Sequence, residues 1–242
     1  MIQVIVTKYC PDCGSANLVK NGKDYKGDQK FRCNDCDTCG TLDATGRYTP
    51  ERKEEILRAY QERSTQSVRG IRRTFGVART TLARWLKQKA KTLPDVANTL
   101  DPARADDVLE LDELWSFVRS KDNQRWVWIA LCRRTRQIVA FFVGDRSAAS
   151  CRQLWDRLPE ADRRCHTFSD FWDAYQKVFV TGKHHSVGKE SGETNHVERW
   201  NNTLRQRLAR FVRKTLSFSK GDFYHELVLR LFIIRYNIEC VS

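Results

Sequence analysis

Two Cys-x-x-Cys pairs near the start of the chain constrain its fold most. Cys10 and Cys13 form the first pair, Cys33 and Cys36 form the second pair, and nineteen residues separate the two pairs. Each pair turns two thiolates to one side, and two such pairs complete the tetrahedral shell of a zinc ion. A segment this short buries too little apolar surface to fold alone, so metal binding would supply its folding energy. The pattern predicts a zinc ribbon over residues 1–46 with one structural Zn²⁺.

A third cysteine pair leaves one of these ligands open. Cys39 follows Cys36 at the same spacing, so it could replace Cys33 in the zinc shell. We favour Cys33, because an aromatic and a basic residue precede it, as suits a ribbon strand that enters a metal-binding turn. Short strands are expected over residues 18–23 and 29–33.

Residues 47–91 change to a helical pattern. Apolar residues recur at helical spacing in segments that begin near Pro50, Ser67 and Ala78, and Gly76 marks a turn before the third. A short helix, a glycine turn and a helix with a basic outer face are typical of a helix-turn-helix. A three-helix adaptor that only packs on the rest of the chain is the alternative. The outward residues of the third helix, which would contact DNA, are Arg79, Thr80, Thr81, Arg84 and Lys87.

The rest of the chain predicts a mixed α/β domain. Residues 92–107 lack apolar periodicity and are expected to form a linker. In residues 108–242, a meander of three strands is expected over 108–118, 125–132 and 137–143, with its first turn at Asp122-Asn123. A helix, a fourth strand near 165–169 and further helices follow. This order matches a ribonuclease-H-like α/β (α+β) fold, in which the first long strand lies at the sheet centre and the fourth lies beside it.

Three acidic residues lie in or beside segments that are expected to be buried, where a carboxylate without a partner destabilises the fold. Asp112 lies inside the first apolar strand, Asp170 ends the fourth strand, and Glu198 opens a long basic helix. A carboxylate in apolar surroundings needs a compensating cation or hydrogen bonds. In the expected fold the two strand carboxylates are neighbours, and the helix can lie against the same edge. The three residues therefore predict a site for two Mg²⁺ (or Mn²⁺) ions, which take oxygen ligands and serve phosphate chemistry.

Two further acids compete for these positions. Glu113 follows Asp112 directly, and Asp173 follows Asp170 by three residues. Strand alternation puts Asp112 and Glu113 on opposite faces, so only one of them can face the site. Sharing a face with Glu110 favours Asp112 only weakly, and spacing alone leaves the choice open.

The charge of the chain favours a polyanionic partner. The net charge is +13, and residues 199–221 hold seven basic residues and no acid. Arg205 lies two helical turns beyond Glu198 on the same face, where it could hold a DNA phosphate. The residues expected to track a DNA backbone are Arg205, Arg207, Arg210, Arg213 and Lys214.

Several function classes are disfavoured by composition. The chain has no run of 18 apolar residues, which argues against a membrane span, and its first six residues lack the pattern of a signal peptide. Five of the nine cysteines crowd into residues 10–39, unlike the disulfide framework of a secreted protein. A cytoplasmic, nucleoid-associated protein is expected.

Five stretches in the C-terminal part are more specific than any spacing. They are Leu111-Asp112-Glu113-Leu114-Trp115, Ser169-Asp170-Phe171-Trp172-Asp173-Ala174-Tyr175, His196-Val197-Glu198-Arg199-Trp200-Asn201-Asn202, Leu204-Arg205-Gln206-Arg207-Leu208-Ala209-Arg210 and Arg213-Lys214-Thr215-Leu216-Ser217-Phe218-Ser219-Lys220. In these stretches the chain resembles the insertion sequence one family of bacterial DDE transposases. The ribbon and helix-turn-helix also fit, because members of that family carry such a module in front.

The resemblance implies both a function and a choice of residues. Asp112, Asp170 and Glu198 would be the metal-binding catalytic acids, in preference to Glu113 and Asp173. The protein would bind the terminal inverted repeats of its element, cut the 3′ ends with Mg²⁺-activated water and join them to target DNA. Because two ends must be held together, a homo-oligomer on double-stranded DNA is expected. The alternatives are a DNA-binding regulator with an inactive C-terminal domain, and a structure-selective nuclease.

Overall fold

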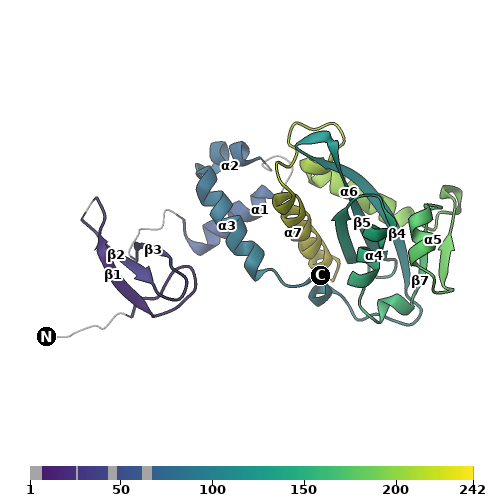
Figure 1. The fold of residues 1–242 in the computed structure, drawn as a ribbon, viewed down its shortest axis with the longest axis horizontal. Coiled ribbons are helices and arrows are strands. Elements are labelled where there is room, and N and C mark those ends of the chain that lie inside the picture. The colour runs from purple at the N-terminus through teal and green to yellow at the C-terminus, as the bar shows by residue number, and fades with distance from the viewer. Residues whose placement is uncertain (1–6, 26, 43–47, 62–66, 242) are drawn as a thin grey trace. The chain divides into compact units, whose positions relative to one another are not determined.

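The computed structural model describes residues 7–25, 27–42, 48–61 and 67–241, which divide into two compact units (Figure 1). The first unit spans residues 1–53 and the second spans residues 54–242. The expected end of the ribbon at residue 46 lies outside the described residues. Within the described ranges, no helix combines the length and the apolar character that crossing a membrane requires.

The first unit contains a small antiparallel sheet. Its strands, in the order β1-β2-β3, are β1 (Leu18–Lys23), β2 (Gln29–Cys33) and β3 (Cys39–Thr41). The first two strands have the predicted bounds, and β2 runs directly into Cys33 as expected. The third strand was not predicted, because three residues carry too little alternation to be recognised. Among residues 7–25 and 27–42, only Cys10 and Cys33 are buried.

Three short helices open the second unit. They are α1 (Pro50–Tyr60), whose first residues belong to the first unit, α2 (Val68–Phe75) and α3 (Arg79–Thr92). The Ser67 hydroxyl accepts a hydrogen bond from the Gly70 amide at 2.8 Å and so caps α2. Gly76 ends α2 with a φ of 69°, a conformation that glycine adopts without strain. The apolar stripes of α1 and α3 are buried, at Ile56, Leu57, Tyr60, Leu82, Trp85 and Leu86, whereas in α2 Ile71 is buried and Val68 and Phe75 are half-buried.

A mixed five-stranded sheet forms the centre of the second unit, in the order β6-β5-β4-β7-β8. Its strands are β4 (Val108–Val118), β5 (Ser120–Cys132), β6 (Ile138–Gly144), β7 (His166–Ser169) and β8 (His184–Ser186). β4 pairs antiparallel with β5 and parallel with β7. The prediction that the first long strand is central, with the fourth strand beside it, is confirmed. The expected turn at Asp122-Asn123 is wrong, because β5 begins at Ser120 and the chain reverses at Arg119, whose φ is 68°.

Helices cover both faces of this sheet. On one face, α4 (Ala148–Arg157) and α5 (Asp173–Val178) enclose an apolar cluster that includes Leu109, Trp128, Leu154 and Tyr175. On the other face lie α6 (Asn195–Arg207) and α7 (Asp222–Val241), which contact β4 and β6 respectively. Alternate residues of β4 therefore face two different sets of helices. Short 3-10 helices complete the unit: η1 (Val96–Thr99), η2 (Asp162–Arg164), η3 (Lys189–Ser191) and η4 (Ala209–Phe211).

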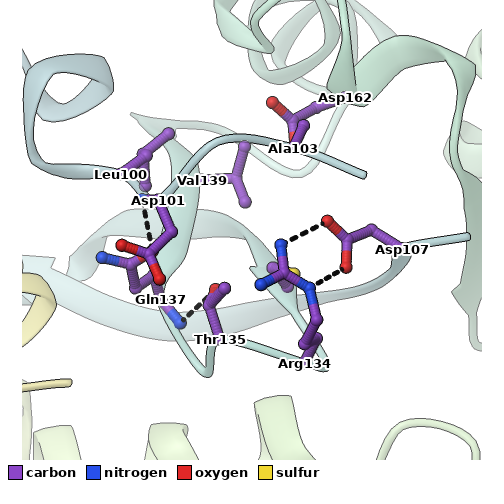
Figure 2. A pocket seen from close by; sticks show the side chains of 10 residues that line it. Leu100, Asp101, Ala103, Asp107, Arg134, Thr135, Gln137, Val139 and Asp162 are labelled. Atoms are coloured by element: carbon purple, nitrogen blue, oxygen red, sulfur yellow. Dashed lines mark hydrogen bonds and ion pairs between the residues drawn. The ribbon is translucent and has the colours of Figure 1, made fainter. Parts of the chain in front are cut away.

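The segment expected to be a linker, residues 92–107, packs on the sheet. The Asp101 amide donates to Gln137 Oε1 at 2.9 Å, and Gln137 Nε2 donates to the Thr99 carbonyl at 2.8 Å. Figure 2 shows Asp107 facing Arg134, which donates to both carboxylate oxygens at 2.6 and 2.8 Å. These contacts join residues far apart in the sequence, so local composition did not reveal them.

Candidate metal centres

The four predicted cysteines converge in the first unit. Cys10 Sγ lies 3.5 Å from Cys36 Sγ, and Cys13 Sγ lies 3.6 Å from Cys33 Sγ. All four sulfur atoms lie within 4.8 Å of one another. Zinc–thiolate bonds of about 2.3 Å in a tetrahedron put sulfur atoms about 3.8 Å apart, so this cluster fits a structural Zn²⁺ ion.

The choice between Cys33 and Cys39 follows from the same geometry. Cys33 belongs to the cluster, whereas the Cys39 sulfur accepts a hydrogen bond from Asn21 at 3.0 Å. The preference for Cys33 is therefore confirmed. Hydrogen bonds from Thr38 lower the pKa of the Cys36 thiol to about 6, whereas the neighbouring cysteine thiols help to raise the pKa of Cys13, so Cys36 forms the thiolate of a zinc ligand more readily than Cys13 does.

Strand register brings Asp112 and Asp170 to neighbouring positions. β4 and β7 pair in parallel, with Glu110 opposite Phe168. Asp112 and Asp170 each lie two residues further along, so strand alternation puts them on one face of the sheet, Asp112 within β4 and Asp170 just beyond the end of β7. Asp170 Oδ1 accepts a hydrogen bond from the Trp172 amide at 3.0 Å, which orders the turn after β7.

Glu198 lies in the first turn of α6, on the side of the sheet that Asp112 faces. Burial, together with the charges of Glu113, Asp170 and Glu198, raises the pKa of Asp112 to about 7. The three predicted acids are thus electrostatic neighbours. In residues 7–25, 27–42, 48–61 and 67–241, only the four cysteines place three or more ligand atoms within 4.8 Å, so the carboxylates are more widely spaced.

Asn201 belongs to this group, although no pattern in the sequence assigns it a role of its own. It is buried on α6, one turn beyond Glu198, and its Nδ2 donates to Asp112 Oδ2 at 2.6 Å. Its own Oδ1 is buried without a hydrogen-bond partner among the described residues. Its only sequence signal was a spacing of three residues from Glu198, the spacing of neighbours on a helix face. A buried amide oxygen beside carboxylates adds to a donor set that suits a hard cation.

The two competing acids have other partners. Glu113 accepts hydrogen bonds from Arg146 and, at 2.9 Å, from the Tyr175 hydroxyl, on the face covered by α4 and α5. Burial raises its pKa, while Arg146 opposes the shift. Asp173 is exposed and pairs with Lys177 at 2.5 Å. The prediction that Asp112 and Glu113 face opposite sides of β4 is therefore confirmed.

The predicted DNA-contacting residues differ in exposure. Arg79, Thr80, Arg84 and Lys87 are exposed on α3, and Thr81 is half-buried. In the C-terminal stretch Arg213 and Lys214 are exposed, while Arg205 and Arg207 are half-buried.

Arg205 and Arg210 differ most within that stretch. Burial and the charge of Arg213 lower the pKa of Arg205, and the nearby charge of Asp112 opposes this shift. Arg205 therefore lies near the carboxylates. Arg210 is 8% exposed and donates to the Tyr60 hydroxyl of α1, with its guanidinium 5.3 Å from the ring centroid. Its expected place on an exposed DNA track is corrected, because tertiary packing buries its guanidinium.

Comparison with known proteins finds separate matches for the N-terminal and the C-terminal part of the chain. Residues 107–238 match the family model described as IS1 transposase, and residues 4–37 match the InsA N-terminal domain. The chain is 40% identical over 126 residues to the insertion element iso-IS1n protein InsB of Shigella dysenteriae, which covers 52% of this chain and 93% of that protein. It is 38% identical over 120 residues to the insertion element IS1 4 protein InsB of Escherichia coli (strain K12), covering 50% of this chain and 70% of the relative. The InsB protein of insertion element IS1 from Shigella flexneri is also 38% identical, with 88% of its length covered.

Proposed function

Because the chain belongs to the IS1 transposase family, we propose that it binds the terminal inverted repeats of an insertion sequence and catalyses Mg²⁺-dependent 3′-end cleavage and strand transfer into target DNA. The observation that carries the chemistry is the grouping of Asp112, Asp170 and Glu198 at one sheet face, with Asp112 made hard to ionise by its surroundings. The protein would act as a homo-oligomer on DNA in the cytoplasm, at the nucleoid.

We further propose that residues 108–242 form a ribonuclease-H-like catalytic domain. The central β4, its parallel partner β7 and the meander β4-β5-β6 support this assignment. The zinc ribbon (1–46) and a helix-turn-helix (47–91) would bind the repeats, and residues 92–107 would connect them to the catalytic domain. The glycine turn at Gly76 and the exposed basic residues of α3 support the helix-turn-helix.

Two Mg²⁺ ions would be held by Asp112, Asp170 and Glu198. The donors fit, because they are hard oxygen ligands and because the buried Asn201 Oδ1 lies beside them without a hydrogen-bond partner in the described structure. When bound, two such Mg²⁺ ions would activate the nucleophile and neutralise charge on the leaving oxygen. Proximity to a cation would also offset the burial that raises the pKa of Asp112.

The remaining residues would bind and orient the DNA. Asn201 holds one oxygen of Asp112 at 2.6 Å and so sets the direction of that carboxylate. Arg205 would bind a phosphate beside the site, since it makes no hydrogen bond or ion pair within the described part of the chain. Arg207, Arg213 and Lys214 would extend the backbone track, and the exposed face of α3 would contact the repeat.

The test uses a DNA fragment that carries one end of the element, incubated with Mg²⁺ and target DNA. Wild-type protein is expected to cut the 3′ end and to form a joined product. Asp112→Asn is expected to reduce cleavage at least about a thousandfold, because several kcal/mol of charge stabilisation depend on that carboxylate. Glu113→Gln, a matched change at the next residue, is expected to retain cleavage in its folded fraction.

Two outcomes would contradict the proposal. Cleavage that survives in Asp112→Asn and fails in Glu113→Gln would assign the site to the opposite face of β4. If the wild type hydrolyses DNA and forms no joined product, the protein is a nuclease that does not catalyse strand transfer.

A further inference from the structure

Glu110 is the most completely bonded carboxylate beside the proposed site. It lies two residues before Asp112 on the same face of β4, and its side chain is 0% exposed. Its Oε2 accepts hydrogen bonds from the backbone amides of His196 at 2.8 Å and Val197 at 3.0 Å. Its Oε1 accepts from Arg133 Nε at 2.8 Å and from His196 Nδ1 at 2.5 Å. A carboxylate has about four acceptor positions, so Glu110 has no room to bind an ion.

The two backbone bonds identify Glu110 as a cap for α6 that comes from another element. The first amides of a helix have no partner within the helix, and the helix dipole favours a negative charge at this end. Thr194, the residue before the helix, makes no capping hydrogen bond with its side chain to the α6 backbone. Glu110 therefore caps α6, because its carboxylate accepts the hydrogen bonds of the first amides of the helix.

A second attachment follows one turn later. Asn201 on α6 donates to Asp112 on β4 at 2.6 Å. Glu110 and Asp112 are thus joined to α6 at two points, residues 196–197 and residue 201. Glu198 lies between them. Two attachments along one strand restrict both the rotation and the sliding of the helix, and so restrict the position of the Glu198 carboxylate relative to Asp112.

Arg133 extends this arrangement to the segment before the helix. While its Nε donates to Glu110, its Nη2 donates at 2.7 Å to both the carbonyl and the carboxylate of Glu193. Through Arg133, the Glu110 carboxylate therefore also fixes Glu193, which lies just before α6.

We propose that Glu110 is a positioning residue that sets Glu198 at the correct distance from Asp112 for metal binding, without binding the metal itself. The proposal rests on the proposed transposase function, because it gives Glu110 a role toward the Asp112, Asp170 and Glu198 site. Residues that orient metal ligands typically change metal affinity by roughly 10–100-fold when they are replaced.

Asp107 provides a matched control for a purely structural effect. Its carboxylate is as buried as that of Glu110, at 2% exposure, and is fully bonded to Arg134 (Figure 2). It also accepts from the Arg104 amide at 2.8 Å. None of these partners belongs to α6. Glu110→Gln and Asp107→Asn both remove one buried charge with little change of shape, and only the first weakens the attachment of α6.

The experiment compares full-length wild type, Glu110→Gln and Asp107→Asn in three measurements. Hydrogen exchange is expected to show at least tenfold lower protection of the His196 and Val197 amides in Glu110→Gln alone. Mn²⁺ binding, followed by the electron paramagnetic resonance of the free ion, is expected to weaken at least tenfold in Glu110→Gln and less than threefold in Asp107→Asn. Cleavage at saturating DNA is expected to fall at least tenfold in Glu110→Gln, with affinity for the DNA end within twofold of wild type. If Glu110→Gln does not fold, Glu110→Asp is used, because its carboxylate ends one methylene short of α6.

The possible results separate the inference from the function beneath it. Equal Mn²⁺ affinity and equal cleavage in wild type and Glu110→Gln would overturn the positioning role while the metal site stands. Equal losses of Mn²⁺ affinity and cleavage in Asp107→Asn would also overturn the positioning role, because the loss of any buried carboxylate would then explain the effect of Glu110→Gln. A wild-type protein that binds no Mn²⁺ would overturn the proposed metal site and this inference together.

Discussion

The ribbon of the first unit and the α/β sheet of the second maintain their folds by opposite means. In residues 7–25 and 27–42 only Cys10 and Cys33 are buried, and Tyr25 is 92% exposed. In the second unit, Trp128 and Leu154 are fully buried in a cluster shared by β4, β5, β6, α4 and α5. The ribbon is organised around four converging sulfur atoms, and the sheet is organised around apolar surface removed from water.

This difference determines which perturbations each region should survive. A metal shell depends on four ligands and on their thiolate state, so a change at one ligand removes most of the folding energy. An apolar core distributes its energy over many contacts, so a single truncation is costly but survivable.

Zinc removal is expected to have the largest effect and to separate the two regions completely. Structural zinc contributes about 10 kcal/mol or more of apparent binding free energy to a small metal domain. Chelation should therefore abolish the hydrogen-exchange protection of β1, β2 and β3 and leave the protection of β4, β5 and β6 unchanged. Retained protection of β1 and β2 after complete zinc removal would contradict the account of the ribbon.

A core truncation is expected to produce the reverse pattern. Leu154→Ala removes a fully buried side chain of α4 and should lower the unfolding free energy of the second unit by about 3 kcal/mol. Zinc content of the ribbon should not change. Leu216→Ala, at a side chain that is 98% exposed, serves as the control and should change stability by less than about 0.5 kcal/mol.

Acid is expected to destabilise the second unit through His225. This side chain is fully buried on α7 between Ser116 and Ser219, and burial lowers its pKa from 6.5 to about 4. The folded state therefore disfavours the protonated form. The stabilisation is fully present above pH 6.5 and is lost as the pH falls through 4, by about 3 kcal/mol at most. Urea unfolding measured between pH 7 and pH 4 should show this loss of unfolding free energy in the wild type and not in His225→Asn. If the unfolding free energies of the two proteins fall in parallel with pH, His225 is not the cause.

The smallest effect is expected at Cys39, which tests the ribbon at its most ambiguous position. Cys39→Ser removes a thiol that bonds Asn21 and lies outside the cluster. Zinc stoichiometry should remain one per chain, with a stability change below about 0.5 kcal/mol. Cys33→Ser should lose the ion, and an exchange of these two results would show that Cys39 is the ligand.

Local patterns were sufficient for much of the fold. The bounds of β1, β2 and β4 agree with the expected strands, and the helices before the sheet begin within a residue of their expected starts. These elements carry strong alternation, helical periodicity or capping residues. Local patterns were insufficient where tertiary contacts decide the structure. The hairpin turns at Arg119 instead of at Asp122-Asn123, and residues 92–107 pack on β6 and α7.

The candidate site divides along the same line. Asp112 and Asp170 could be placed as neighbours from strand order, because register in a parallel pair fixes which residues are level. Asn201 and Glu110 could not be given roles in advance, since their partners lie 89 and 86 residues away. Arg210 shows the converse, because its basic neighbours indicate an exposed track and its contact with Tyr60 buries it.

By itself, the sequence determined the ribbon, the helical segment and the order of the strands, and it narrowed the candidate zinc ligands to five cysteines and the candidate metal-binding acids to five carboxylates. Each of these depends on spacing within one or two elements, which the chain carries locally. Only the tertiary structure decided that Cys39 stands apart, that Arg210 is buried and that Glu110 and Asn201 hold α6 on both sides of Glu198. Those outcomes depend on which distant donors reach a buried polar group. A buried polar group without a hydrogen bond destabilises the fold, so the tertiary structure, and not the local sequence, sets its partner.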